Sequence, residues 1–194
     1  MGFSSAARLS FLKRSLPALL IAGALASGAH AAVQPGLHPL IARDHVPAAV
    51  LAQQAAGAQA LAGTQHLKLG LNLPLRNEAE LDSLIGQLYD PQSPNYHRYL
   101  SVQEFTARFA PTQEDYDKVV NWAKANGLKV TGTPVNRRMV NVEGDVRSIN
   151  RALHLTVRQY QHPSENRLFF APDREPTIDG LDVPLLHITG LDDY

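Results

Sequence analysis

The stretch Leu67-Lys68-Leu69-Gly70-Leu71-Asn72-Leu73 alternates between leucine and residues that are polar or glycine. Successive side chains of a β-strand point to opposite faces of the sheet, so this period of two predicts a strand that is buried on one face only. Pro74 follows directly, and proline has no backbone N–H to extend the ladder. The pattern therefore predicts one strand of a sheet that is covered on one side.

Three helices are expected after this strand. In the first, Asn77 is predicted to cap the helix with Glu80 as the reciprocal partner, and Asp90-Pro91 ends it. Four apolar residues fall on one face of this helix, at spacings of three and four: Leu81, Leu84, Ile85 and Leu88.

The second and third helices carry their own start signals. Ser101 and Glu104 form a capping box, and Phe105 and Phe109 follow on one side of a short helix. Thr112 opens the third helix. Its expected buried residues are Tyr116, Val119, Val120 and Ala123, and its left-handed C-terminal residue is Gly127.

The remaining sequence predicts mainly strands. Two are expected at Leu128–Val135 and Met139–Glu143, and a short helix capped by Asp145 follows. The next strand, Leu155–Tyr160, is expected to pair with a hairpin arm. That arm is Leu168-Phe169-Phe170-Ala171, and the proline-rich tail from Ala171 to Tyr194 is expected to be mostly extended.

This order of elements predicts an α+β fold, a ferredoxin-like antiparallel sheet with helices packed on one face. The residues expected to face the helices are Leu67, Leu69, Leu71, Val130, Val140, Val142 and Val157.

The opposite face of the sheet is expected to stay open and to mix polar with charged side chains. It is a candidate docking surface, and a merely solvated face is the alternative, since antiparallel sheets often expose one side to water. Its expected residues are Lys68, Asn72, Met139, Asn141, Glu143, Arg158 and Tyr160.

The N-terminus has the pattern of a secretory signal peptide. Three basic residues precede the apolar stretch 16–26, which is too short to span a bilayer. Ala29-His30-Ala31 predicts cleavage between Ala31 and Ala32, so that residues 1–31 are the signal peptide; a membrane anchor is the alternative. Residues 32–64 are rich in alanine and glutamine. They are expected to form a leader, disordered or loosely docked.

Composition restricts the partners and the chemistry. Without residues 1–31 the chain has 15 basic and 18 acidic residues, a net charge of −3, which does not indicate binding to nucleic acid. No membrane partner is expected after signal cleavage. The chain has no cysteine, so neither a disulfide framework nor a thiolate metal site is available.

No catalytic, cofactor-binding or metal-binding residue is predicted. The serines beyond residue 31 lie outside a Gly-x-Ser-x-Gly context; they are Ser83, Ser93, Ser101, Ser148 and Ser164. The histidines considered do not form a His-x-x-x-His pair; they are His97, His154, His162 and His187. Surface histidines are one interpretation and acid sensing is another, because histidine gains charge between about pH 5 and 8.

Several segments resemble, in order and spacing, the activation domain of pro-kumamolisin, the propeptide domain of the sedolisin-type serine-carboxyl peptidases. The resemblance covers residues 65–191. Its motif residues are Asp90, Pro91, Ser93, Tyr96, Tyr99, Leu100, Phe105, Phe109, Trp122, Gly127, Gly190 and Leu191.

The resemblance implies a ferredoxin-like pro-domain that precedes a subtilisin-like catalytic domain with a Ser-Glu-Asp triad and a calcium ion. It implies that the pro-domain assists folding of that domain, inhibits it, and is released by processing in acid. The expected partner is therefore a sedolisin-type catalytic domain. Calcium is expected only in that domain, and no cofactor is expected here.

The sequence ends at Tyr194, where the linker would begin at residues 192–194. We expect a chain that lacks the catalytic domain, either as a fragment or as a separately encoded inhibitor. Residues Leu191 to Tyr194 are expected to thread through the peptidase cleft. The alternative function is a secreted non-catalytic binding module or stand-alone inhibitor with the same fold.

Overall fold

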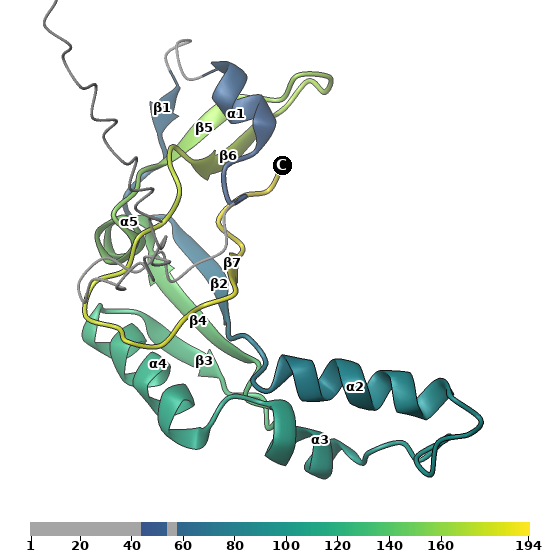
Figure 1. Cartoon of the computed structure of the whole chain (residues 1–194). Helices are drawn as coiled ribbons and strands as arrows, with labels where there is room; N and C mark the ends of the chain where they lie inside the picture. The colour runs from purple at the N-terminus through teal and green to yellow at the C-terminus, as the bar shows by residue number, and fades with distance from the viewer. Residues whose placement is uncertain (1–43, 54–57) are drawn as a thin grey trace, which may run out of the picture. The chain divides into compact units, whose positions relative to one another are not determined.

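The computed structural model describes residues 44–53 and 58–194 (Figure 1). The predicted signal peptide and its cleavage site lie outside these residues. Helices and antiparallel sheets together confirm the α+β class. The elements are α1 Ala48–Gln53, β1 Gln59–Ala60, β2 His66–Asn72, α2 Glu78–Tyr89, α3 Val102–Phe109, α4 Gln113–Ala125, β3 Lys129–Gly132, β4 Met139–Asp145, α5 Val146–Leu153, β5 Val157–Gln161, β6 Leu168–Pro172 and β7 His187–Thr189.

The larger sheet has four strands in the order β3-β4-β2-β7, and all of its pairs are antiparallel. The strand β2 is hydrogen-bonded on both sides, to β4 over its whole length and to β7 over its last three residues. The pair Leu69–Val142 sets the register of β2 against β4, so buried residues of both strands meet on one face.

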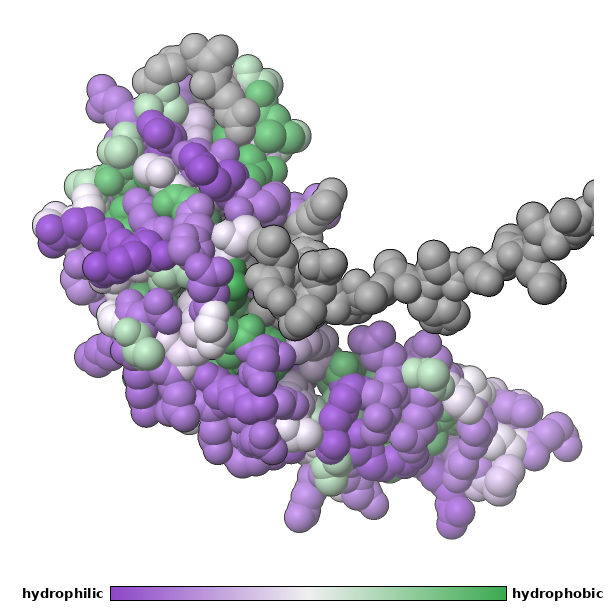
Figure 2. All heavy atoms as spheres, turned by 60° about the vertical axis from the view of Figure 1, so that its left-hand side comes forward, coloured by the Kyte–Doolittle hydropathy of each residue, from purple (hydrophilic) through white to green (hydrophobic). Residues whose placement is uncertain are grey.

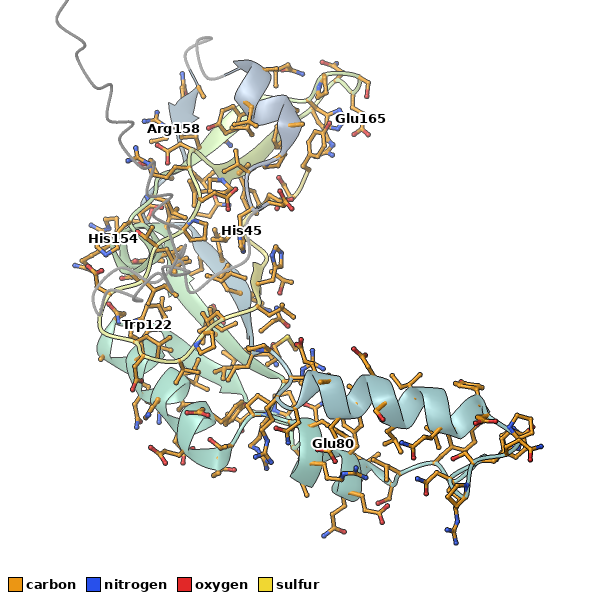
Figure 3. All side chains as sticks on the ribbon, in the orientation of Figure 1. His45, Glu80, Trp122, His154, Arg158 and Glu165 are labelled. Carbon is orange, nitrogen blue, oxygen red and sulfur yellow. The ribbon has the colours of Figure 1, made fainter. Side chains whose placement is uncertain are left out.

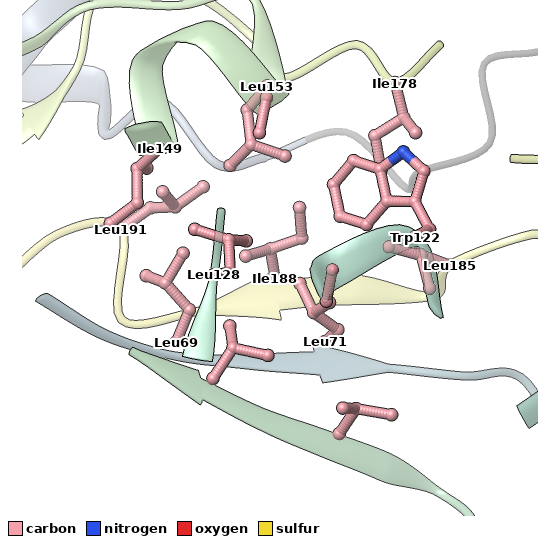
Figure 4. Packing of buried hydrophobic residues seen from close by; sticks show 14 of the residues in the cluster. Leu69, Leu71, Trp122, Leu128, Ile149, Leu153, Ile178, Leu185, Ile188 and Leu191 are labelled. Carbon is pink, nitrogen blue, oxygen red and sulfur yellow. The ribbon is translucent and has the colours of Figure 1, made fainter. Parts of the chain in front are cut away.

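Helices α4 and α5 and the tail after Pro172 cover one face of this sheet (Figures 1 and 4). The alternating leucines of β2 are buried here, as their period predicts. Trp122 packs among them and donates a hydrogen bond from Nε1 to the carbonyl oxygen of Asp179 at 2.9 Å. The aromatic ring thus joins α4 to the tail.

The fourth strand of this sheet is β7 and not the expected segment Leu155–Tyr160. Leu186 donates its backbone N–H to the oxygen of Asn72 at 2.7 Å, and β7 continues the pairing. The three residues of β7 carry little local signal, and their partners lie about 115 positions earlier in the chain. A local pattern does not specify which distant strand it pairs with.

The expected strand and its hairpin arm exist, but in a second sheet with the order β1-β5-β6. The predicted pairing is confirmed by the cross-strand pair Tyr160–Phe169. Both aromatic residues are buried in a small separate cluster with Val50 and Ala171. Val157 does reach the main core, as expected, although its strand belongs to the other sheet.

The described part of the expected leader is packed into the fold, which corrects the expectation of a loosely docked segment. Val50 is fully buried in the small cluster, Leu61 is buried in the main core, and β1 pairs with β5. His45 is buried as well. Composition alone pointed to disorder, and a few apolar residues with long-range partners overrode it.

Helices α2 and α3 share an apolar cluster of their own, formed around Leu84, Leu88 and Phe109. The capping box at Ser101 and Glu104 is confirmed. Asn77, in contrast, is not a side-chain cap. Its backbone is left-handed, with φ of 55°, and its Nδ2 donates to the oxygen of Arg108 in α3. Glu80 pairs with Arg108 too, so both expected capping residues instead connect the two helices (Figure 3).

The other local start and stop signals are confirmed. Thr112 accepts a hydrogen bond from the backbone N–H of Asp115, and Asp145 accepts one from that of Ser148. Gly127 follows α4 with φ of 77°. Ile85 of the predicted apolar face of α2 is 45% exposed, because α3 covers only the neighbouring positions.

The C-terminal residues are folded against the domain, which corrects the expectation that Leu191 to Tyr194 are free to thread through a cleft. Leu191 is only 1% exposed. Asp193 donates its backbone N–H to Phe170, and the ring of Tyr194 packs against Phe169 at 4.9 Å between centroids. Within the described residues, no helix is long and apolar enough to cross a membrane.

A substitution at Gly190 tests how much the packing of the tail on β2 contributes to stability. Its φ is 87°, and a Cβ atom there would lie 2.3 Å from the backbone oxygen of Lys68 in β2. We expect Gly190→Ala to lower the free energy of unfolding by about 3 kcal/mol, measured by urea denaturation. Gly180→Ala is the control, since Gly180 also has a positive φ but open space around it; we expect a loss of about 1 kcal/mol. Equal losses would contradict the close packing of the tail on β2.

Candidate docking surface

On the face of the four-stranded sheet opposite α4 and α5, Lys68 is exposed and Met139, Asn141 and Glu143 are half-buried, so within the described residues this face is open. Residues on β2 and β4 alternate, so those between the buried positions point to this side. Five of the seven residues predicted for the docking surface lie here: Lys68, Asn72, Met139, Asn141 and Glu143. Lys68 pairs with Glu143 and Asn72 with Met139 across the strands, and Asn141 pairs with Gly70, which was not predicted.

A shallow depression of about 410 Å³ lies in the middle of this face. Gly70 is among the residues that line it, and the side chains of Thr189 and Met139 close in over this glycine, since a Cβ atom there would come within 2.6 Å of Thr189 Oγ1 and 2.8 Å of Met139 Sδ. Its rim includes Thr131 of β3 and Asn141 of β4. The depression therefore presents hydroxyl and amide groups beside a thioether, a mixture suited to a protein partner.

Charged residues form a row at one end of the depression. Glu143 lies between Lys68 of β2 and Lys129 of β3, so that opposite charges are direct cross-strand neighbours. His66 Nδ1 lies 3.6 Å from Glu143 Oε1. A second depression of about 270 Å³ adjoins this row and includes Asp145, where the backbone hydrogen bond from Ser148 lowers the pKa of the carboxyl group.

Three side-chain hydrogen bonds hold the β7 side of the depression in place. Asn72 donates from Nδ2 to the backbone oxygens of Gly70 and His187, at 3.1 and 3.2 Å. Thr189 donates from Oγ1 to the oxygen of Gly70 at 3.4 Å. The surface is thereby preorganised, which reduces the conformational entropy lost on binding.

Arg158 and Tyr160 do not belong to this face, which corrects their prediction. Both lie on β5 in the second sheet, where Arg158 donates from Nη1 to the oxygen of Ala58 and pairs with Asp173. Tyr160 is only 3% exposed, and desolvation raises the pKa of its hydroxyl. The error follows from assigning β5 to the wrong sheet.

Most of the predicted motif residues build the fold and do not lie on the open face. Leu100, Phe105 and Phe109 pack between α2 and α3. The others on this side lie in the connection between these helices: Asp90 Oδ1 accepts the N–H of Gln92, Ser93 Oγ accepts that of Asn95, and Pro91 lies between them. Trp122, Gly127, Gly190 and Leu191 are placed around the main core.

Tyr96 and Tyr99 are exceptions among the motif residues, because both are exposed. Their rings flank His97, with centroid distances of 3.8 and 6.1 Å. His97 itself has a left-handed backbone, with φ of 57°, and donates its N–H to the oxygen of Leu88.

The other histidines considered in the sequence analysis are dispersed over the domain. His154 Nε2 lies 3.0 Å from Asp179 and His162 Nε2 lies 3.9 Å from Glu165. Within residues 44–53 and 58–194, no group of three histidine, aspartate or glutamate side chains could hold a metal ion.

Three residues important to this region were missed in the sequence. Gly70 stood in the alternating pattern but was read only as a spacer. Thr189 was missed because β7 was not predicted. His45 carries no usable local signal, because its burial depends on Glu175 and Ile188, which are more than 120 positions away.

Comparison with known proteins places the chain in a group of peptidase propeptides. A family model described as "Pro-kumamolisin, activation domain" matches residues 53–194. Sedolisin of Pseudomonas sp. strain 101 is 28% identical over 115 residues, covering 59% of this chain and 20% of that protein.

Two further relatives show the same partial match. Xanthomonalisin of Xanthomonas sp. strain T-22 is 26% identical over 118 residues, covering 61% of this chain and 14% of that protein. Aorsin of Aspergillus oryzae is 34% identical over 65 residues, covering 34% of this chain and 10% of that protein. The match spans a fifth or less of the length of each relative.

The charged row gives a prediction. Glu143→Lys would place three positive charges side by side across β2, β4 and β3, and we expect the free energy of unfolding to fall by about 1 kcal/mol at low salt. Salt at about 1 M should remove much of that loss, because it screens exposed charges. The control Glu143→Gln removes the carboxylate without adding charge and should show a smaller loss. A loss in Glu143→Lys that does not depend on salt would exclude a charge effect.

Proposed function

Because the chain belongs to the pro-kumamolisin activation-domain family, we propose that it acts as folding assistant and inhibitor of a secreted sedolisin-type acid serine peptidase. The observation that carries the proposal is the open face of the four-stranded sheet. One face of this sheet is covered by α4, α5 and the tail, whereas the other presents a preorganised depression beside a charged row. The domain would act by binding and not by chemistry of its own.

The open face suits a protein partner better than a small ligand. The depression is shallow, and its mixed lining continues along β4 into the second depression. A typical stable interface buries about 800 Å² on each partner. The side chains of Asn72 and Thr189, already fixed by hydrogen bonds to the backbone oxygen of Gly70, would give such an interface its specificity, while Met139 supplies apolar contact.

Both proposed activities follow from the same contact. A catalytic domain that folds against this surface is stabilised by the binding free energy, as with any ligand that binds only the native state. A domain that stays bound also hinders access of substrate. Release in acid is proposed to follow from protonation, since carboxylates and histidines in the contact change charge as the pH falls.

Export is part of the proposal. We expect the exported chain to begin at Ala32, because Ala29-His30-Ala31 has the small residues that signal peptidase requires. N-terminal sequencing of protein recovered outside the cytoplasm checks this. Ala31→Arg should abolish cleavage at that bond, and an unchanged N-terminus in this variant would contradict the assigned site.

The central test is binding to the separately purified catalytic part of a sedolisin-type peptidase. We expect inhibition and tight binding at pH 7 and much weaker binding at pH 4. Thr131→Arg places a large charged side chain on the rim of the depression and should weaken binding at pH 7 by about tenfold or more, a cost typical of disrupted contacts.

Thr177→Arg is the matched control. Thr177 is also exposed, but its backbone N–H binds the oxygen of Leu153 in α5, on the covered side of the sheet. This variant should bind like the wild type. Equal weakening in both variants would exclude the open face as the contact. Absence of binding to every peptidase of this type would instead favour a non-catalytic binding module.

Figure 2 shows hydrophilic side chains over most of α2 and α3 on the face in view. Leu84, Leu88 and Phe109 of these helices are buried in their shared cluster, whereas Ile85, Tyr89 and Val102 are exposed. The depression preorganised by Asn72 and Thr189 makes the open face of the sheet the stronger candidate for the contact.

A further inference from the structure

His45 is a buried polar residue that connects two distant parts of the chain. Its side chain has no exposed surface. Nε2 lies 3.0 Å from the backbone nitrogen of Ile188 in β7, and Nδ1 lies 3.1 Å from Oε2 of Glu175. Figure 3 labels this residue near the four-stranded sheet. One imidazole thus joins the segment before α1 to an edge strand.

The hydrogen bonds determine which nitrogen carries the proton. A backbone N–H can only donate, so Nε2 must accept from Ile188 and cannot itself be protonated. Nδ1 therefore carries the hydrogen and donates it to Glu175. Neutral His45 in this tautomer satisfies both contacts.

The groups around His45 act in opposite directions: His187 favours a neutral ring, whereas the carboxylates of Glu175 and Asp192 favour a charged one. The ring of His187 is stacked on it at 4.2 Å between centroids, with an interplanar angle of 18°. Glu175 also accepts the backbone N–H groups of His45 and Val46. The titratable groups that face His45 are Glu175, His187 and Asp192.

We propose that His45 is an acid-sensitive latch, which holds β7 in place while the ring is neutral and releases it when the ring is protonated. A proton on Nε2 would set one donor against another, because the N–H of Ile188 already points at that atom. A positive ring would also lie directly against His187. Glu175 attracts the charge, but it contacts Nδ1, which already carries a hydrogen. It therefore does not repair the contact with Ile188.

The sign of the pH effect follows from the pKa shifts. Burial lowers the pKa of His45 below its ordinary value of 6.5, His187 lowers it further, and the hydrogen bond with Glu175 offsets part of this. The unfolded chain therefore binds this proton more readily than the folded one. Stability should fall as the pH drops below about 6.5, until the pH passes the lowered pKa.

Glu175 extends the effect to lower pH. Desolvation opposes its ionisation, yet the hydrogen bonds from His45 and Val46 lower the pKa of this carboxyl below its ordinary 4.5. Its contribution is present above about pH 4.5 and is lost as the pH falls through the lowered pKa. As the pH falls, protonation of His45 first and of Glu175 afterwards therefore weakens the same contact between the segment before α1 and the rest of the domain.

Opening of β7 would also change the open face, since Thr189 lines its depression. This consequence rests on the proposed function, whereas the latch itself does not. The two can therefore fail separately: the latch is tested on the full chain without any partner.

The test follows the imidazole and the Ile188 amide in the wild-type chain by NMR. We expect His45 to titrate below pH 6.5. Hydrogen exchange at Ile188, corrected for its intrinsic rate, should show increased opening between pH 7 and pH 5. The increase is up to tenfold for each pH unit by which the pKa is lowered. His45 titrating at or above 6.5 would overturn the proposal, whatever any variant does.

The variant His45→Gln separates two properties of the side chain, its ability to accept a hydrogen bond and its ability to take up a proton. Its amide oxygen can still accept from Ile188 but takes up no proton, so the extra opening in acid should disappear. His66→Gln is the control, because His66 is exposed; this variant should keep the wild-type response. If His45→Gln does not fold, the wild-type titration still decides. An acid response in folded His45→Gln equal to that of the wild type would also overturn the latch.

Discussion

The pairing of β2 on both of its edges is the constraint on which the rest of the structure depends. Hydrogen bonds to β4 on one side and β7 on the other fix its register, and a slip of one residue would turn the leucines toward water. Because the leucine side chains of β2 face the helices, the residues between them must face the opposite side of the sheet. The core and the candidate docking surface are thus two consequences of one alternating strand. Without disulfides, burial and hydrogen bonding stabilise this arrangement.

The family motif and the candidate surface hardly overlap, because the motif residues build the apolar clusters and the candidate surface lies on the opposite face of the sheet. Motif residues such as Trp122, Gly190 and Leu191 close the core, and those between α2 and α3 shape a separate cluster. Gly70, Asn72 and Thr189 also support the packing and pairing of the strands, whereas the other residues of the open face alternate with the buried ones and make no such contact described above. The exposed residues of this face can therefore change while the motif that preserves the fold stays the same.

Local signals predicted much of this fold. The capping residues Ser101, Thr112 and Asp145 and the glycine after α4 were identified correctly because each acts within a few positions of itself. The errors share one cause, which is dependence on distant residues. The strand β7 is recognisable only through β2, and Asn77 binds α3 instead of capping α2. Tyr160 was assigned to the open face because its strand was placed in the wrong sheet. Five of the seven residues predicted for the open face do lie on it, because strict alternation along β2 and β4 determines which side of the sheet each residue faces.

The fixed position of the last residues determines where any polypeptide attached after them would leave the domain. Asp193 and Tyr194 are anchored to β6 by a backbone hydrogen bond to Phe170 and by packing against Phe169, and Tyr194 also contacts the ring of His162, which follows β5. Any polypeptide that continues beyond this point would leave from a fixed position on the small sheet. A tether with a defined origin samples less volume, so a domain attached to it meets the sheet at a high effective concentration. Cutting the tether would end that advantage without removing a single buried side chain.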